Sequence, residues 1–354
     1  MKKSPAVAPA GGLAAGPRWK SLLAPWAIPG KMAAPGMPPD GAREGAAMSA
    51  KRVVDYLVYV VVRILICVVQ AMRVESGAAG ARGLAWLFCD VLRIRGKVVD
   101  ENLRRAFPDC SPQERHRLAQ RMWEHLFLMV LEIAHTPRKI HHTNWRDFVE
   151  LEKADELIRL MLEDRPTLIT TAHLGNFEVA GYVLGILGFP TFTIARSLDN
   201  RYLDRFVNRF RGATGQFIIP KNGGYDQMLH VLSHGGVMTF LADQYAGPKG
   251  CWVEFFGQPA SAHKAIALLA LEHQAPVVAT SALRTGEPLH FRLSTHAVAD
   301  PRHGGEDCGS VRSLTQWYTK CLEEMIRMAP DQYWWLHRRW KDTRPPRKAR
   351  KQAA

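Results

Sequence analysis

Apolar and polar positions follow two alternating patterns from about residue 167 onward. Short β-branched and apolar runs predict strands at residues 168–172, 191–195, 217–220, 237–242 and 276–283. Segments with apolar positions at helical spacing predict helices at residues 179–187, 200–211, 226–233, 262–273 and 311–328. Because strands alternate with helices, we predict an α/β fold with a mostly parallel central sheet flanked by helices.

Three segments between residues 80 and 162 have helical patterns. Ser111, Pro112 and Glu114 match the N-cap, N1 and N3 positions of a helix start. That helix is expected to continue to about residue 134. Residues 80–91 and 148–162 are also expected to be helical.

Residues 53–72 form an almost wholly apolar segment that Asp55 and Arg63 interrupt. Its length of about twenty residues is enough to cross a bilayer. A central arginine costs about 2.5–3.5 kcal/mol on insertion. Since the polar positions fall near one helical face, we predict an N-terminal membrane-associated helix. It either lies in the interface or spans the bilayer with its polar stripe against the protein. A buried core helix of a soluble domain is the alternative.

Composition divides the rest of the chain. Residues 1–47 are rich in Ala, Gly and Pro without periodicity, which predicts a disordered leader. Residues 48–95 are expected to form the membrane-associated helices, and residues 96–342 the main domain. Residues 343–354 are expected to form a basic, flexible tail.

Charge and cysteine content limit the partners. The net charge of +14 indicates anionic partners: nucleic acid, an anionic membrane surface, or phosphorylated or acidic substrates. The six cysteines form no C-x-x-C pair and have no zinc spacing with histidine. They are typical of reduced thiols in a cytosolic-facing protein, so neither a disulfide framework nor a metal site is predicted.

A histidine follows the strand at residues 168–172 and carries the candidate chemistry. Gly175 and Asn176 predict a turn and helix cap after His173, and Glu178 falls in the first turn of the next helix. On one helix, side chains five residues apart point about 140° away from each other and cannot meet. Across a strand–turn–helix unit they can, so we predict His173 as a general base whose tautomer Glu178 holds. A structural, hydrogen-bonded histidine is the alternative.

Two further polar residues follow predicted strands. Arg196 follows residues 191–195, and Asp243 follows residues 237–242. Functional groups gather at the carboxyl ends of parallel strands, so both are expected near His173. Near the end of the chain, three tryptophans are interleaved with Arg, His and Lys over residues 334–341. That run suits a membrane interface, a phosphate site or nucleic acid.

Five blocks, in order, resemble the bacterial lipid A biosynthesis acyltransferases, the lauroyl/myristoyl transferase branch of the lysophospholipid acyltransferase superfamily. The resemblance covers most of residues 50–342. The blocks are N-L-R-R-A-F-P at 102–108, H-L-G-N-F-E at 173–178, Arg196 with Asn200, Asp243-Gln244 with V-E-F-F-G-Q-P-A at 253–260, and W-W-L-H-R-R-W-K at 334–341. Tyr245 departs from the family's Asp-Gln-Asp. The F-P-E-G-T-R motif of the phosphoglycerol branches does not occur, which favours the glycolipid branch.

The resemblance implies a glycerolipid acyltransferase-like fold and a membrane-associated O-acyltransferase at the cytoplasmic face of the bacterial inner membrane. Acyl-ACP or acyl-CoA would donate the acyl chain, and a hydroxyl of a lipid A precursor or related phosphorylated glycolipid would accept it. No bound cofactor, metal or nucleic acid is implied. The implied site residues are His173 and Glu178 for catalysis and, for substrate binding, Arg196, Asn200, Asp243, Gln244, Phe256 and Gly257.

Three alternatives remain from the residues. A lysophospholipid acyltransferase would use the same histidine and acid on another lipid. A thioester or lipid hydrolase would use them on water and release free fatty acid without an acylated acceptor. A non-catalytic basic membrane binder would tolerate loss of His173 and bind with a steep salt dependence.

Overall fold

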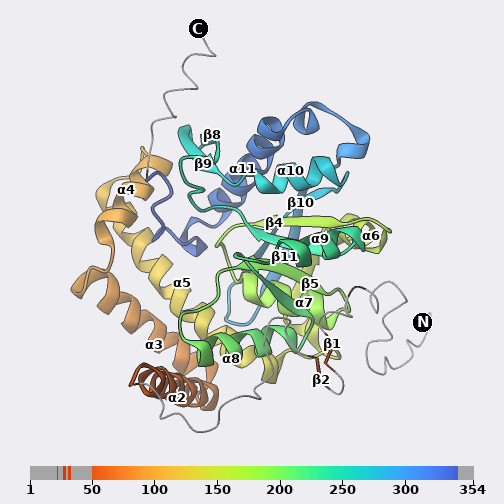
Figure 1. Cartoon of the computed structure of the whole chain (residues 1–354). Coiled ribbons are helices and arrows are strands. Elements are labelled where there is room, and N and C mark those ends of the chain that lie inside the picture. Colours follow the sequence, from red (N-terminus) through yellow and green to blue (C-terminus); the bar gives the residue numbers. More distant parts are fainter. Residues whose placement is uncertain (1–21, 23–26, 29–30, 33–49, 342–354) are drawn as a thin grey trace, which may run out of the picture.

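A seven-stranded sheet forms the centre of the computed structural model, which describes residues 50–341 together with residues 22, 27–28 and 31–32 (Figure 1). The strands of this sheet are β3 (Val149–Glu152), β4 (Thr167–Thr171), β5 (Thr191–Ala195), β6 (Gln216–Pro220), β7 (Val237–Leu241), β10 (Val277–Arg284) and β11 (Phe291–Ala299). Their order is β3-β11-β10-β4-β7-β5-β6. Only β10 and β11 pair in antiparallel fashion, and the other five pairs are parallel. The predicted mostly parallel sheet is confirmed.

The later helices of the chain cover the sheet, and the helices that precede the sheet in sequence pack together beside it (Figure 1). The early helices are α2 (Ala50–Ala71), α3 (Val74–Trp86), a π-helical turn (Leu87–Val91), α4 (Gly96–Ala106) and α5 (Pro112–Lys139). The later ones are α6 (Ala154–Leu162), α7 (Phe177–Ile186), α8 (Arg201–Gly212), α9 (Tyr225–Ser233), α10 (Ala265–Glu272) and α11 (Val311–Met328). The predicted Ser111 capping box is present at the start of α5.

Both faces of the sheet are buried, as parallel strands require. Successive residues of β4 point to opposite faces. Leu168 joins the cluster that contains Leu269 of α10 and Leu322 of α11, whereas Ile169 packs with Leu160 of α6. The faces are therefore occupied by core, and polar chemistry is confined to the edges of the sheet.

The prediction of a helix over residues 148–162 is wrong in its first part. Val149 to Glu152 form strand β3, which pairs with β11 in parallel register from Val149 opposite Phe291. Val149 and Leu151 pack into one cluster, so the sequence V-E-L-E alternates with the period of a strand. The strand β11 and the antiparallel pair β8 (Cys251–Phe255) and β9 (Gln258–Ala262) were not among the predicted strands.

Most of the predicted leader lies outside the described residues. Within it, Leu22 is fully buried in the main core cluster. Strands β1 (Ala27–Ile28) and β2 (Lys31–Met32) form a short antiparallel pair. The composition of residues 1–47 does not predict these contacts. The predicted tail at 343–354 lies outside the described residues.

Helix α2 is attached to the domain along one side. Near its start, Asn200 Nδ2 donates to the Asp55 carbonyl at 2.8 Å. Near its end, His135 Nε2 lies 2.9 Å from the Val69 carbonyl oxygen, and Gln70 Nε2 donates to the Ala134 carbonyl at 2.8 Å. The opposite side exposes a row of large apolar side chains: Val54, Leu57, Val61, Ile64, Leu65 and Val68. Among the described helices, α2 is the one long and apolar enough to cross a membrane.

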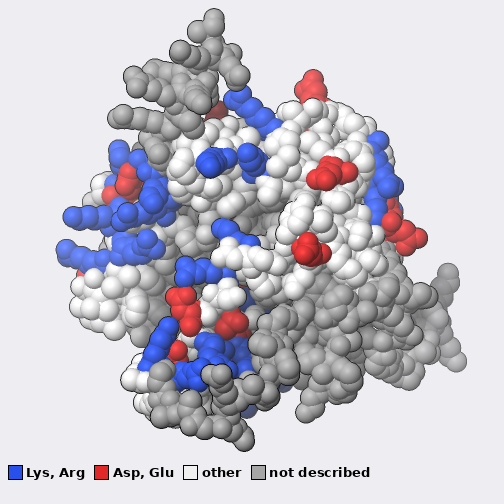
Figure 2. All heavy atoms as spheres, in the orientation of Figure 1, with Lys and Arg blue, Asp and Glu red and all other residues white. Residues whose placement is uncertain are grey.

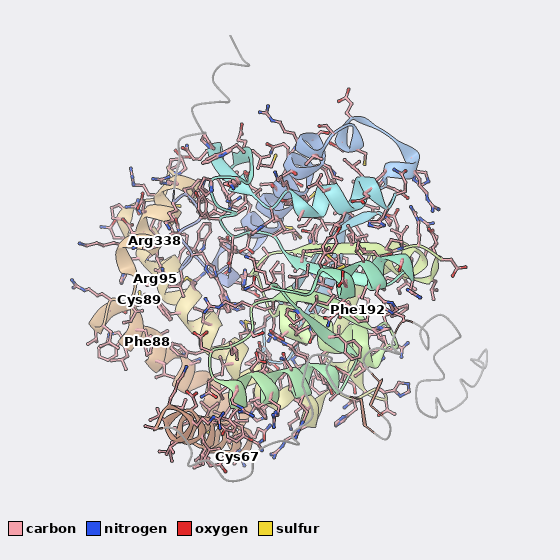
Figure 3. All side chains as sticks on the ribbon, viewed as in Figure 1. Cys67, Phe88, Cys89, Arg95, Phe192 and Arg338 are labelled. Carbon is pink, nitrogen blue, oxygen red and sulfur yellow. The ribbon has the colours of Figure 1, made fainter. Side chains whose placement is uncertain are left out.

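Basic side chains gather on the edge of the molecule that carries α4 (Figure 2). Arg93, Arg95 and Lys97, in the loop and first turn of α4, are all exposed. Arg338 of the C-terminal segment is also exposed and lies at the same edge as Arg95 (Figure 3). Residues more than 240 positions apart in sequence thus contribute to one basic surface.

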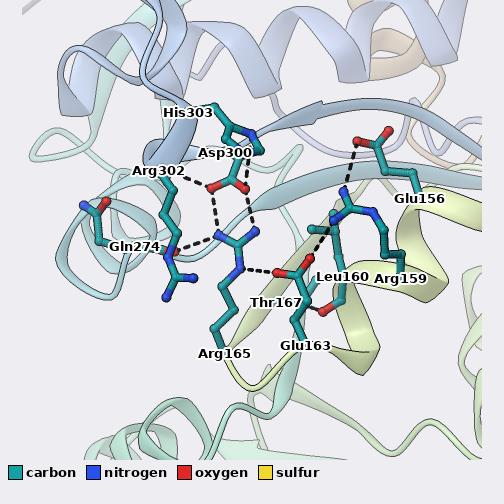
Figure 4. Close-up of polar contacts among 10 residues, drawn as sticks. All are labelled: Glu156, Arg159, Leu160, Glu163, Arg165, Thr167, Gln274, Asp300, Arg302 and His303. Carbon is teal, nitrogen blue, oxygen red and sulfur yellow. Dashed lines mark hydrogen bonds and ion pairs between the residues drawn. The ribbon is translucent and has the colours of Figure 1, made fainter.

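An ion-pair network fixes the amino-terminal end of β4 (Figure 4). The Arg165 guanidinium donates two hydrogen bonds to Asp300, at 2.8 and 2.5 Å, and a third to Glu163 at 2.6 Å. Arg165 and Asp300 are both buried. The network joins the loop before β4 to the loop after β11, at the edge of the sheet opposite the residues that follow β4. We assign it a structural role.

Candidate active site

The register of β4 and β7 brings His173 and Asp243 together. Thr171 lies opposite Leu241 in the parallel pair, and the Ala242 amide donates to the Thr171 carbonyl at 2.9 Å. Because the two chains leave the sheet in step, His173 faces Asp243, and Nδ1 lies 2.8 Å from Asp243 Oδ1. Both residues are buried, Asp243 completely. The prediction that His173 and Asp243 converge is confirmed.

The carboxylate of Asp243 sets the protonation of His173. Burial alone lowers the pKa of His173, but the charge and hydrogen bond of Asp243 and the charge of Glu178 outweigh it, so that the pKa is raised above 6.5. Burial raises the pKa of Asp243, but the charge of His173 and its hydrogen bond hold it at about 2. Asp243 is therefore ionised, and Nδ1 of His173 carries the proton that it donates to Oδ1. Nε2 is left as the basic nitrogen.

Nε2 of His173 points toward Gln244 and a second imidazole. The Gln244 amide nitrogen lies 3.3 Å from His173 Nε2 and 3.2 Å from His337 Nε2. The two imidazole rings are 4.9 Å apart, and Trp334 and Phe177 pack on the His173 ring at 5.2 and 5.3 Å. Burial and the neighbouring His173 lower the pKa of His337, so His337 is neutral near pH 7. The surroundings of the basic nitrogen are thus largely aromatic.

Backbone contacts on both sides hold the turn after His173. The His173 carbonyl accepts from the Trp334 amide at 3.0 Å, and the Asn176 amide donates to the Ala282 carbonyl at 2.8 Å. Gly175 has φ of +60°, and a Cβ there would lie 1.9 Å from the Ala282 carbonyl oxygen. Asn176 Oδ1 accepts from the Val179 amide and caps α7, as predicted.

A buried network beneath this turn was not predicted from the sequence. Glu132 of α5 accepts two hydrogen bonds from Arg284 of β10, at 2.5 and 2.8 Å, and one from Asn176 Nδ2 at 3.0 Å. His125 Nε2 lies 3.2 Å from the Gly175 carbonyl oxygen and is bonded through Nδ1 to Arg284. Burial and the Arg284 charge lower the pKa of His125 to about 3, so it is neutral. The network ties α5 and β10 to the turn that carries His173.

The predicted hydrogen bond between Glu178 and His173 is not formed, and this prediction requires correction. Glu178, in the first turn of α7, instead forms a double ion pair with Arg211 of α8. Asp243 occupies the position next to Nδ1 because β7 is the direct neighbour of β4 in the sheet. Glu178 still acts on His173 through its charge, which raises the pKa of the imidazole.

The structure does not bring Arg196 to His173. Its side chain is 79% exposed and pairs with Asp199 at 2.9 Å. Strand β5, which precedes it, is separated from β4 by β7, a distance of about 10 Å at normal strand spacing. Asn200 caps α8 through the Tyr202 and Leu203 amides and also holds α2, so its observed contacts are structural.

Phe256 and Gly257 form the turn between β8 and β9. Both have positive φ, 53° and 66°. Phe256 is 4% exposed and packs against Phe107, Trp335 and Trp340. This turn therefore anchors the C-terminal segment that carries His337.

His337 and Trp334 are site residues that were not predicted individually. Their signal was the basic and aromatic run at 334–341, which the sequence marked as a block without distinguishing its members. The isolated bridge of Leu174 with Tyr333 lays this run against the turn after His173. Only the folded chain brings two histidines 164 positions apart to either side of Gln244.

One group of potential metal ligands occurs in the described part of the chain, away from His173. The ligand atoms of Cys89, Asp90 and His116 lie within 4.8 Å of one another. Asp90 already accepts hydrogen bonds from His116 at 2.8 Å and Gln120 at 2.9 Å. Burial and the Asp90 charge raise the pKa of Cys89 to about 11, so its thiol stays protonated. We assign no metal to this group.

Comparison with known proteins gives consistent matches. The family model described as bacterial lipid A biosynthesis acyltransferase matches residues 46–342. The lipid A biosynthesis lauroyltransferase of Escherichia coli K12 is 24% identical over 269 residues, covering 74% of this chain and 84% of that protein. The palmitoleoyltransferase of the same organism is 24% identical over 259 residues, covering 72% and 81%.

Two further proteins show likenesses over less of their length or at lower identity. The phosphatidylinositol mannoside acyltransferase of Mycobacterium tuberculosis H37Rv is 26% identical over 181 residues, covering 49% of this chain and 54% of that protein. The crystal structure of the 1-acyl-sn-glycerophosphate acyltransferase PlsC from Thermotoga maritima matches at 13% identity and a TM-score of 0.35, over 74% of this chain and all of that one. The family match spans nearly the whole described chain, and with it this protein belongs to the bacterial lipid A biosynthesis acyltransferases.

Proposed function

We propose that this protein transfers a fatty acyl chain from a thioester donor to a hydroxyl group of a lipid A precursor or related glycolipid, with His173 as general base. The observation that carries this proposal is the buried Asp243 carboxylate on Nδ1, which leaves Nε2 of His173 as a base of raised pKa. The named activities of the relatives, two lipid A acyltransferases and a mannoside acyltransferase, favour a glycolipid acceptor.

The reaction follows from the available atoms. His173 Nε2 takes the proton of the acceptor hydroxyl while the hydroxyl oxygen forms a bond to the thioester carbonyl carbon. The C–S bond then breaks, and the imidazolium returns the proton to the leaving thiolate. Asp243 stabilises the imidazolium between these steps. The Gln244 amide lies beside Nε2, so the acceptor hydroxyl must take up a position next to it or displace it.

Direct attack by the acceptor fits this site better than a covalent acyl-enzyme. Among the described residues, the groups within hydrogen-bond distance of the His173 ring nitrogens are the Asp243 carboxylate and the Gln244 amide. Neither is the hydroxyl or thiol that an acyl-enzyme would need. A hydrolase would use the same base on water, and product analysis distinguishes the two.

Substituting Asp243→Asn is expected to lower kcat/KM about 100-fold and to move its pH dependence. Activity needs neutral His173, so in the wild type it rises with pH through a pKa above 6.5. Asparagine removes the charge that raises this pKa, and the acid limb therefore shifts to lower pH. A pH profile of kcat/KM for both proteins measures the shift.

The matched control for this substitution is Asp199→Asn, which removes an exposed carboxylate paired with Arg196. It should leave the profile unchanged. An Asp243→Asn profile that overlays the wild type would refute the assigned role of this carboxylate.

We further propose that α2 lies in the membrane interface rather than across the bilayer, on the cytoplasmic side. Its polar side packs on α5 and α8, where the Arg63 guanidinium lies 4.7 Å from the Phe206 ring centre. Helix α8 carries Arg201, Arg205, Arg209 and Arg211, so a spanning α2 would draw these cations into hydrocarbon. The exposed apolar side can enter the interface without that cost.

The substitution Leu57→Asp, on the exposed side of α2, is expected to weaken binding to anionic vesicles about tenfold or more. Leu162→Asp, at a similarly exposed leucine at the end of α6, is the control and should not change binding. Co-sedimentation of the full chain with vesicles measures both. Equal binding of the wild type and Leu57→Asp would contradict the interfacial position.

The cellular test of the proposed function is mass spectrometry of the lipids from a strain that lacks this protein. We expect a glycolipid that is lighter by one acyl chain, restored by the wild-type gene and not by His173→Ala. An unchanged glycolipid profile would contradict the proposed acceptor.

A further inference from the structure

The cation expected from the sequence to bind an anion near His173 is Arg196, but the structure places other arginines nearer to this site. Arg196 pairs with Asp199 at the surface and follows β5, which β7 separates from β4. On the other side of the imidazole, the C-terminal segment runs directly from His337 into Arg338, whose side chain is exposed. The C-terminal segment therefore connects the site around His173 with the basic surface at the start of α4.

Helix α4 is held against the C-terminal segment by one buried side chain. Asn102 Nδ2 donates to the His337 carbonyl at 2.6 Å and to the Trp335 carbonyl at 2.8 Å. Arg95 is the N-cap residue of α4, seven residues before Asn102. Its positive charge contributes to the lowered pKa of His337, after burial and the charge of His173. Arg95 and Arg338, the residue after His337, lie at the same edge of the molecule (Figure 3).

The positive charges of Arg95 and Arg338 are not neutralised by neighbouring carboxylates among the described residues. Among the described residues, neither Arg95 nor Arg338 has an ion pair with a carboxylate, whereas Arg105 and Arg115 on the same side pair with Glu101 and Asp100. The first turn of α4 contains no acid, so the positive end of the helix dipole adds to these charges. Figure 3 places both arginines on one edge of the molecule.

We propose that Arg95 and Arg338 form a phosphate-binding subsite beside His337, which positions a phosphorylated substrate for reaction at His173. This inference rests on the proposed function. Guanidinium groups bind phosphate oxygens through paired, charge-assisted hydrogen bonds. The phosphate can belong to the glycolipid acceptor or to the carrier of the thioester donor, and the kinetics distinguish these sources.

The test uses Arg95→Gln, Arg338→Gln and the double variant of the full chain, with Arg312→Gln on an exposed position of α11 as the control. For a phosphorylated acceptor, we expect KM to rise about tenfold in each single variant and kcat to change little. For the same acceptor after phosphatase treatment, wild type and variants should have the same KM. A rise confined to the KM of acyl-CoA or acyl-ACP would support the subsite and assign its phosphate to the donor.

A second readout separates this inference from the proposed function. Binding of inorganic phosphate, followed by broadening of its ³¹P NMR line, should be lost in the double variant and kept in Arg312→Gln. If the wild type binds phosphate but transfers no acyl chain, and the double variant no longer binds phosphate, the proposed function is refuted and the subsite is supported. If transfer proceeds and neither KM nor phosphate binding changes in the double variant, the subsite is refuted and the function stands.

Discussion

Replacing His173 by alanine is expected to lower acyl transfer about 10²- to 10⁴-fold, the contribution of a positioned general base. Nε2 of this buried imidazole is the nitrogen that can accept the hydroxyl proton, because Nδ1 donates its own proton to Asp243. The loss should fall mainly on kcat, since the proton is transferred in the transition state. Steady-state rates of thiol release with a fixed acceptor measure it.

The control for this substitution is His303→Ala. The His303 side chain is 77% exposed and lies in the ion-pair network at the amino-terminal end of β4, away from the site (Figure 4). It should retain wild-type activity. Circular dichroism and thermal unfolding must match among all three proteins. A folded His173→Ala protein that keeps its transfer rate would contradict the assignment of the base.

Replacing Glu132 by alanine is expected to lower the free energy of unfolding by about 3–5 kcal/mol, the cost of breaking a buried ion pair on one side. Glu132 is completely buried, and the Arg284 side chain is 8% exposed. Without the carboxylate, Asn176 Nδ2 loses its acceptor in the interior, and the Arg284 guanidinium loses two hydrogen bonds and keeps the one to His125. Chemical denaturation of the purified protein in detergent gives the difference.

The matched control is Glu150→Ala, whose partner is also an arginine. The Arg292 and Glu150 side chains are 45% and 60% exposed, so solvent screens this pair and its loss should change the free energy of unfolding much less. If both variants unfold at the same denaturant concentration, the buried network beneath the His173 turn does not contribute the stability assigned to it.

The strand pattern allowed the central part of the site to be predicted. The strands that became β4 and β7 were predicted as apolar runs, and each is followed by a polar residue at its carboxyl end. Because strands that are both parallel and adjacent keep a fixed register, His173 and Asp243 then had to meet. Periodicity cannot supply the order of strands in a sheet, however. It therefore could not indicate that β7 is the neighbour of β4 and that β5, with Arg196, lies one strand further away.

The partner of His173 was misassigned for a related reason. Sequence proximity favoured Glu178, five positions away, over Asp243, seventy positions away. In the structure, Arg211 of α8 engages the Glu178 carboxylate, and this long-range contact has no local signal. His337 is brought to the site by the bridge between Leu174 and Tyr333, which pairs irregular segments rather than predicted strands. Such contacts depend on the tertiary fold and not on local pattern.

The most direct test of the proposed function is product analysis with the purified full chain, a thioester donor and a phosphorylated glycolipid acceptor. Mass spectrometry would quantify the acylated acceptor and free fatty acid against the thiol released. We predict one acylated acceptor for each thiol, with both products lost in His173→Ala. Release of thiol and free fatty acid without an acylated acceptor would contradict acyl transfer and identify the site as that of a hydrolase.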